Sequence, residues 1–229
     1  MPKKTKSIKK SDIKADKPWL KKVGFTSYRE ESKATKKTFL IICEGQTESL
    51  YFSSFPILSA KVITYDIGCS NNRLVECAVD LAATGGYDEV WCVFDMDTKP
   101  DHSGQDDDFN SAIQLCANTG LKCAYSNDAF ELWIYLHYHF TDQRNHRNFY
   151  YEQLSQIFGI NYSKQGKKRK FSSEIYQLLK NDERANQNDA IQRSKTLVAR
   201  HADLPPHIQN PVTYVHELVE ELNKHLTER

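Results

Sequence analysis

Three carboxylates stand where two apolar segments of the chain end, and their chemistry suits a metal ion. Glu44 directly follows the apolar residues 38–43, while Asp95 and Asp97 close the apolar segment that begins at residue 89. An extended backbone places residues two apart on the same side, so Asp95 and Asp97 are expected to face one way. Like charges at that range repel unless a cation neutralises them, and hard oxygen ligands suit Mg²⁺ or Mn²⁺. The residues therefore predict a divalent metal site.

The pattern that would bring these carboxylates together is an alternation of strands and helices. Strand-like segments at 38–43, 61–67, 89–95 and 121–126 alternate with helix-like segments at 47–55, 73–83 and 109–118. Continuous rather than alternating hydrophobicity is typical of strands buried on both faces. The alternation predicts an α/β fold with a parallel four-stranded sheet flanked by helices. Because ligands gather at the carboxyl ends of parallel strands, the three carboxylates are expected at one edge of this sheet.

The chain is expected to divide into three parts. Residues 1–37 hold thirteen lysines and arginines against four acidic residues and predict a basic, disordered arm, whereas the whole chain has a net charge of only +1. Residues 38–140 form the α/β domain, and residues 141–229 form a helical cap packed on the same domain. Helices are predicted at 130–140, 150–158, 172–179, 190–201 and 213–226. The arm either attracts nucleic-acid phosphates or is a solvated lead-in.

Composition indicates a globular protein of the cytoplasm. Of the 229 residues, 39% are hydrophobic, and no apolar run approaches the length of a membrane span. The first ten residues contain no apolar segment resembling a signal sequence, so no membrane partner is expected. The six cysteines never approach a C-x-x-C spacing, which favours buried free thiols.

Several other charged groups leave two interpretations open. Five cations precede Phe171 and predict either a nucleic-acid contact or a solvated loop: Lys164, Lys167, Lys168, Arg169 and Lys170. The acidic residues 106–108 are expected in a solvated loop that runs from Thr98, although a second metal cluster has the same composition. His137 and His139 point apart on a helix, which favours surface or core roles over a zinc site. The chain has neither a P-loop nor a G-x-S-x-G motif.

Four motifs in order resemble a known family. They are Ile41-Ile-Cys-Glu-Gly-Gln-Thr-Glu48 with Tyr51-Phe52, Val90-Trp-Cys-Val-Phe-Asp-Met-Asp97, Phe130-Glu-Leu-Trp133 and Asn210-Pro-Val-Thr-Tyr-Val-His216-Glu-Leu-Val219. The first two resemble the Toprim fold of topoisomerases, primases and the overcoming-lysogenization-defect nucleases. All four are similar to the RloB family of small bacterial Toprim-like proteins linked to restriction and phage-defence loci. This resemblance covers residues 38–226 and implies a Toprim-like α/β fold.

The resemblance also implies roles for the carboxylates. Glu44 matches the Toprim general acid or base, and the Asp95 and Asp97 pair matches the Mg²⁺ ligands. A second metal would need further acids, for which Glu48, Asp128 and Glu131 are candidates. Asp128 and Glu131 have an alternative role, which is to stabilise the N-terminus of the helix that follows them.

Two functions follow as expectations. The first is a metal-dependent nuclease that hydrolyses phosphodiester bonds of DNA or RNA during anti-phage defence, such as abortive infection, with Mg²⁺ or Mn²⁺ as cofactor. Nucleic acid is then its partner, together with an ATPase encoded nearby, since wider relatives often act with one. The alternative is a catalytically silent component of a defence complex that binds metal, nucleotide or nucleic acid.

Overall fold

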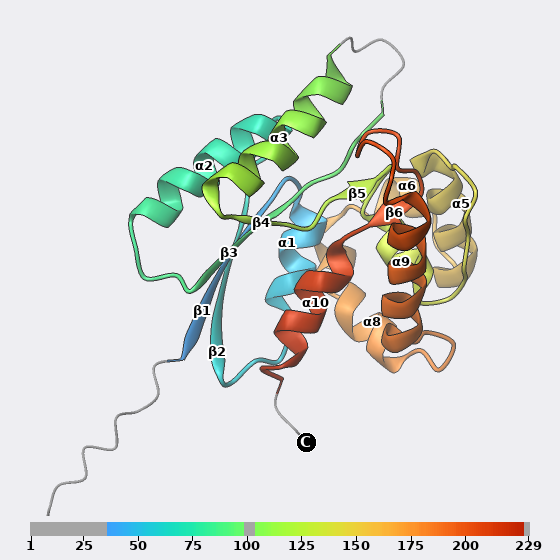
Figure 1. Cartoon of the computed structure of the whole chain (residues 1–229). Coiled ribbons are helices and arrows are strands. Elements are labelled where there is room, and N and C mark those ends of the chain that lie inside the picture. The colour runs from blue at the N-terminus through green and yellow to red at the C-terminus, as the bar shows by residue number, and fades with distance from the viewer. Residues whose placement is uncertain (1–35, 99–103, 227–229) are drawn as a thin grey trace, which may run out of the picture. The chain divides into compact units, whose positions relative to one another are not determined.

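The computed structural model describes residues 36–98 and 104–226 (Figure 1). The predicted disorder of the basic arm, and its contact with nucleic acid, lie outside the described residues except for Lys36 and Lys37. Within the described ranges, no helix is both long enough and apolar enough to cross a membrane. The six cysteines, all described, are free thiols as predicted, but only Cys43, Cys92 and Cys116 are buried.

The core of the fold is a four-stranded parallel sheet. Its strands are β1 (Lys37–Cys43), β2 (Ala60–Asp66), β3 (Glu89–Val93) and β4 (Lys122–Cys123), in the spatial order β2-β1-β3-β4. All three pairings are parallel. The predicted α/β class and the order of the strands are therefore confirmed. The strand predicted at 89–95 ends at Val93, and the one predicted at 121–126 is only Lys122–Cys123, because Ser126 belongs to the separate strand β5 (Ser126–Asn127).

Alternate side chains of β1 enter two different cores. Phe39, Ile41 and Cys43 pack on one face of the sheet against α1 (Gln46–Ser53) and helices of the C-terminal part. Leu40 and Ile42 pack on the other face against α2 (Asn71–Ala83) and α3 (Gln105–Thr119), which lie together in Figure 1. All five side chains are fully buried. Burial on both faces explains why the sequence of β1 is continuously apolar.

Helix α3 begins earlier than its sequence suggests. The prediction of a solvated loop reaching residue 108 is wrong, because Asp106, Asp107 and Asp108 form the first turn of α3. Carboxylates at this position are stabilised by the positive end of the helix dipole. The acidic composition of the segment therefore belongs to a helix start rather than to a loop.

The C-terminal part is helical, as predicted, but its boundaries differ. Its helices are α4 (Glu131–Leu136), α5 (Arg147–Phe158), α6 (Tyr162–Gln165), α7 (Arg169–Ser172), α8 (Ile175–Asn181), α9 (Gln187–His201) and α10 (Val215–Asn223). The helix predicted at 130–140 ends at Leu136, and that predicted at 172–179 is two helices, α7 and α8. The two histidines have the predicted core and surface roles: His137 is buried with its Nδ1 3.0 Å from the main-chain oxygen of Trp133, and His139 is exposed.

A small second sheet explains why the last helix starts late. β5 (Ser126–Asn127) pairs antiparallel with β6 (Val212–Thr213), so Thr213 belongs to a strand and not to the predicted helix 213–226. The Ser126 and Thr213 hydroxyl oxygens lie 2.9 Å apart in a buried contact. Ser126 also forms a parallel bridge with Asp95, so the small sheet continues from the end of β3.

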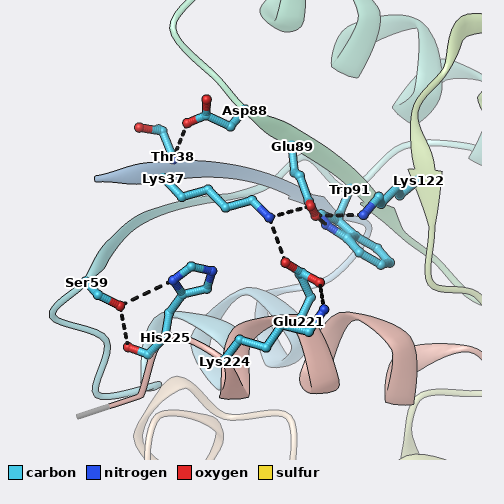
Figure 2. Close-up of polar contacts among 10 residues, drawn as sticks. All are labelled: Lys37, Thr38, Ser59, Asp88, Glu89, Trp91, Lys122, Glu221, Lys224 and His225. Atoms are coloured by element: carbon cyan, nitrogen blue, oxygen red, sulfur yellow. Dashed lines mark hydrogen bonds and ion pairs between the residues drawn. The ribbon is translucent and has the colours of Figure 1, made fainter. Parts of the chain in front are cut away.

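Lys37 links the start of β1 to β3 and α10 through ion pairs (Figure 2). Its ammonium lies 2.6 Å from Glu89 of β3 and 2.6 Å from Glu221 of α10. Glu89 also accepts hydrogen bonds from Trp91 and pairs with Lys122 at 3.0 Å. Lys37 was expected in the basic arm, but it is the first residue of the sheet.

Candidate functional site

A cavity of about 760 Å³ opens at the edge of the sheet where β1 and β3 end. Six acidic residues line it: Glu44, Glu48, Asp95, Asp97, Asp108 and Glu131. Arg147 and Lys167 line it as well. The structure thus places the three predicted carboxylates, and two of the three candidates for a second metal, around one cavity.

Glu44 and Asp95 are in direct contact across the sheet. The backbone N–H of Asp95 donates to Glu44 Oε2 at 3.1 Å. The backbone N–H of Phe130 donates to Asp95 Oδ2 at 3.0 Å, which joins the start of α4 to the same carboxylate. Burial raises the pKa of Asp95 well above its usual value, and the neighbouring Glu48 and Glu44 raise it further, whereas Arg147 lowers it. Such crowding of carboxylates is what a divalent cation would relieve.

Asp97 reaches the cavity by a different geometry from the one predicted. β3 ends at Val93, and Asp97 has a φ of 49°, in the left-handed region that Asp tolerates better than most residues. The turn is held by the Asp97 N–H, which donates to the main-chain carbonyl oxygen of Asp128 at 3.2 Å. Asp95 and Asp97 therefore line the same cavity although the segment joining them is not an extended strand.

Glu48 lies in the first turn of α1 and is only 8% exposed. Burial raises its pKa to about 7, with further contributions from Glu131 and Glu44. Its carboxylate folds back over Gly45, where a Cβ atom would stand 2.5 Å from Glu48 Oε2. Glycine at position 45 therefore leaves room for the Glu48 carboxylate. Glu131, at the start of α4, is 3% exposed and lines the cavity opposite.

Asp128 is 1% exposed and does not line the cavity. Its two carboxylate oxygens accept backbone hydrogen bonds, from Thr98 at 3.0 Å and from Arg147 at 2.8 Å. Arg147 is the first residue of α5, so Asp128 fixes the start of that helix. Asp128 supports the walls of the cavity and does not face into it.

Arg147 is a residue that the sequence did not single out. Its guanidinium Nη1 lies 2.5 Å from Asp97 Oδ1, and its Nη2 donates to the main-chain carbonyl oxygen of Asp128 at 3.2 Å. Nothing in the sequence distinguishes it from Arg144 or from the polar residues around it. Its position depends on how α5 packs against the end of β3, which no local pattern encodes.

Lys167 is the member of the predicted basic cluster that reaches the cavity. Its ammonium lies 5.3 Å from the centre of the Tyr151 ring. Burial lowers the pKa of Lys167, but Glu131 and Tyr151 outweigh burial and raise it above the usual value. All five members are exposed, and the other four, Lys164, Lys168, Arg169 and Lys170, lie on or beside α6 and α7 and do not line the cavity.

Three helix N-termini also meet at this cavity. The N-cap residues Gly45 of α1, Ser70 of α2 and Gly104 of α3 all line it. The Asn71 N–H at the start of α2 donates to Asp108 Oδ2 at 3.1 Å, and the first turns of α1 and α3 contain acidic residues, so carboxylates already use part of this positive potential. The positive ends of helix dipoles favour anions such as phosphate. The cavity therefore combines carboxylates with groups that attract a negatively charged ligand.

The donor set fits a hard divalent cation, since every acidic group around the cavity offers carboxylate oxygen. In the part of the chain that the structure describes, however, no three His, Cys, Asp or Glu side chains already form a compact metal cluster. One of the predicted ligands, Asp97, forms an ion pair with Arg147. Binding a metal would require these side chains to adjust.

Comparison with known proteins gives the family but no closer relative. Neither the curated proteins nor the solved structures contain a significant match to this chain. The model of the RloB-like protein family matches residues 39–222, from β1 to the last turn of α10. The matched region contains every residue that lines the cavity. The chain belongs to the RloB-like protein family.

Proposed function

We propose that the protein is a metal-dependent nuclease that hydrolyses phosphodiester bonds in DNA or RNA. The observation that carries this proposal is the meeting of Glu44, Asp95 and Asp97 in one cavity that also has Lys167 and three helix N-termini on its walls. Carboxylates alone would repel a polyanionic substrate. The positive groups give the same cavity a means of holding a phosphate.

Asp95 and Asp97 would hold Mg²⁺ or Mn²⁺, with Glu48 and Glu131 as candidates for further ligands. A bound divalent ion supplies polarisation of a phosphoryl oxygen and a lower pKa for water. The raised pKa of Asp95 supports this assignment, since part of it comes from the neighbouring carboxylates Glu48 and Glu44.

Glu44 would act as the proton-transfer group. The Asp95 N–H holds its Oε2, which orients the carboxylate at the cavity while the main chain of β1 fixes its position. A carboxylate held there would take a proton from attacking water or return one to a leaving oxygen. Lys167, which also lines the cavity, would contact the phosphate.

The cellular role follows from the family resemblance. We propose that the nuclease acts in the cytoplasm in anti-phage defence, with a nearby-encoded ATPase as partner. The absence of a P-loop motif from the sequence means that ATP hydrolysis by the usual P-loop route would come from that partner.

Cleavage assays on the full chain test the proposal. With Mg²⁺ or Mn²⁺, with and without the neighbouring ATPase, the protein should cut at least one of plasmid DNA, single-stranded DNA and tRNA. Glu44→Gln and Asp95→Asn should each lower the cleavage rate by about 10²-fold or more, the usual contribution of such groups. Asp80→Asn, an exposed carboxylate on α2, is the matched control and should cleave normally. Equal rates for all variants would refute the assignment, and so would lack of cleavage under every condition.

The second candidate function is a silent component that binds metal or nucleotide. The ion pair of Arg147 with Asp97 favours it, because a carboxylate predicted to bind the metal is already paired with a cation of the protein. Calorimetry with Mg²⁺ and a nucleotide on wild type and Asp97→Asn separates the two functions. Binding that depends on Asp97 without any turnover would support the silent component.

A further inference from the structure

Arg147 pairs with one carboxylate oxygen of Asp97, which is a predicted ligand of the metal ion. The Nη1 to Oδ1 distance of 2.5 Å is a close, charge-assisted contact, and the side chains of Arg147 and Asp97 are only 16% and 25% exposed. A divalent ion bound through the same oxygen would stand within a few ångströms of the guanidinium charge. Two cations at that range repel strongly in a partly buried site.

The rest of Arg147 is anchored independently of Asp97. Its backbone N–H donates to Asp128 Oδ2 at 2.8 Å, so the start of α5 does not depend on where the guanidinium points. Its Nε is buried without a hydrogen-bond partner and stands 3.6 Å from Asp128 Oδ2. An unmade hydrogen bond on a buried charged group is costly, so this arrangement leaves the guanidinium only partly satisfied. The backbone of Arg147 is therefore fixed by Asp128, while its guanidinium is held by Asp97 and the Asp128 carbonyl and has one nitrogen without a hydrogen-bond partner.

We propose that Arg147 is a built-in counter-cation that competes with the divalent ion for Asp97 and so weakens metal binding. It neutralises Asp97 while no metal is present and must release that carboxylate when the ion binds. The proposal rests on the proposed metal site but not on cleavage. The opposite role, in which Arg147 only holds Asp97 in the right place for the metal, predicts effects of opposite sign.

Calorimetric titration with Mn²⁺ alone, on full chains without nucleic acid, distinguishes these roles. Arg147→Met removes the charge while keeping much of the side-chain bulk, and it should bind Mn²⁺ about tenfold tighter than wild type. Arg147→Lys keeps a positive charge, so its affinity for Mn²⁺ should increase less. Arg144→Met, with the same change of charge at an exposed position three residues earlier, should bind as wild type does. Equal or weaker binding by Arg147→Met would overturn the proposal.

A double-mutant cycle locates the effect at Asp97. In an Asp97→Asn background, the further change Arg147→Met should increase the affinity for Mn²⁺ much less than it does in wild type. The carboxylate for which Arg147 and the metal ion compete is then absent. A full gain in that background would show that Arg147 acts on the cavity through general charge only, which contradicts direct competition.

A measurement on wild type covers the case in which Arg147→Met fails to fold. The Nε–H signal of Arg147, assigned by nuclear magnetic resonance, should shift when Mg²⁺ saturates the protein, since the guanidinium leaves Asp97. An unchanged signal at saturation would overturn the proposal. Wild type that binds metal without cutting any substrate would refute the nuclease but leave the competition measurable. Failure of both wild type and Arg147→Met to bind Mn²⁺ would refute the metal site and the competition together.

Discussion

Gly45 affects the site because it has no Cβ atom. Its φ of −117° and ψ of 162° are open to any residue, so the backbone does not demand glycine. A Cβ would instead meet Glu48 Oε2 at 2.5 Å. Glu48 is buried among carboxylates with a pKa raised to about 7, so its exact place affects the charge balance of the whole cavity.

Gly45→Ala should therefore change the site without unfolding the protein. We expect the melting temperature to change by only a few degrees, since the clash is with the end of a side chain. Affinity for Mn²⁺ should fall by several-fold because the Glu48 carboxylate must move, as calorimetry would show. In a Glu48→Gln background, the same change at Gly45 should matter less. Unaltered Mn²⁺ affinity in Gly45→Ala would count against Glu48 as part of the site.

The carboxylates of the site are predictable from sequence and the cations largely are not. Glu44 and Asp95 are fixed by the ends of two apolar strands, so local pattern and the rules of parallel sheets place them correctly. Asp128 faces away from the cavity because it bonds to the backbone of Thr98 and Arg147. Arg147 enters through the packing of α5, and packing between distant segments leaves no short-range signature.

At the scale of elements, β1 is the strand on which both cores depend. Ile42→Ala should lower the free energy of unfolding by about 2–5 kcal/mol, because the side chain is fully buried on the face covered by α2 and α3. Ile63→Ala, on the neighbouring edge strand β2 and only partly buried, should cost less. Urea unfolding of both variants measures the difference. Equal losses would mean that β1 is not the central support of the sheet.

The ion-pair network at Lys37 predicts how stability depends on pH. Hydrogen bonds from Lys224 and Lys37 lower the pKa of Glu221 to about 2, and Lys37 also lowers the pKa of Glu89 against the effect of burial. A glutamate unfolded in water has a pKa of about 4.3, so these groups stabilise the fold above that pH. The stabilisation should be lost as the pH falls from about 5 to about 2.

Lys37→Met should lower stability at pH 7 by about 1 kcal/mol and should flatten the acid part of the stability curve. The exposed Lys61→Met on β2 is the matched control and should keep the wild-type slope. Urea unfolding at a series of pH values measures both. An unchanged slope in Lys37→Met would show that the network contributes nothing to acid sensitivity.

Elements with strong local patterns were predictable, and those that depend on distant partners were not. Continuous apolar runs located β1 and β3 almost to the residue. β6 is two residues long and exists only because β5, far away in the chain, pairs with it. The start of α3 was missed because its acidic first turn has the composition of a solvated loop, although helix N-termini favour acids.

On the scale of the whole molecule, charge is unevenly distributed along the chain. A net charge of +1 combines a strongly basic first segment with an acidic remainder. Removing residues 1–35 should weaken binding to nucleic acid and reduce the dependence of affinity on salt, because fewer counterions are released. Fluorescence anisotropy at low and moderate KCl, on the full chain and on residues 36–229, measures both slopes. Identical slopes would show that the basic segment makes no phosphate contacts.

Residues from 36 onward form one compact unit, although sequence patterns divide it near residue 140. α10 shares a core with β1, and β6 pairs with β5. The C-terminal part also supplies Arg147 and Lys167 to the cavity. The helical portion is therefore part of the site as well as a cover for the sheet.

The bridge from Asp95 to Ser126, and the pairing of Ser126 with Thr213, join a carboxylate of the cavity to a strand that lies far along the chain. The surroundings of Asp95 are therefore complete only when β6 has paired with β5. The cavity thus depends on the folding of the C-terminal part as well as on the parallel sheet.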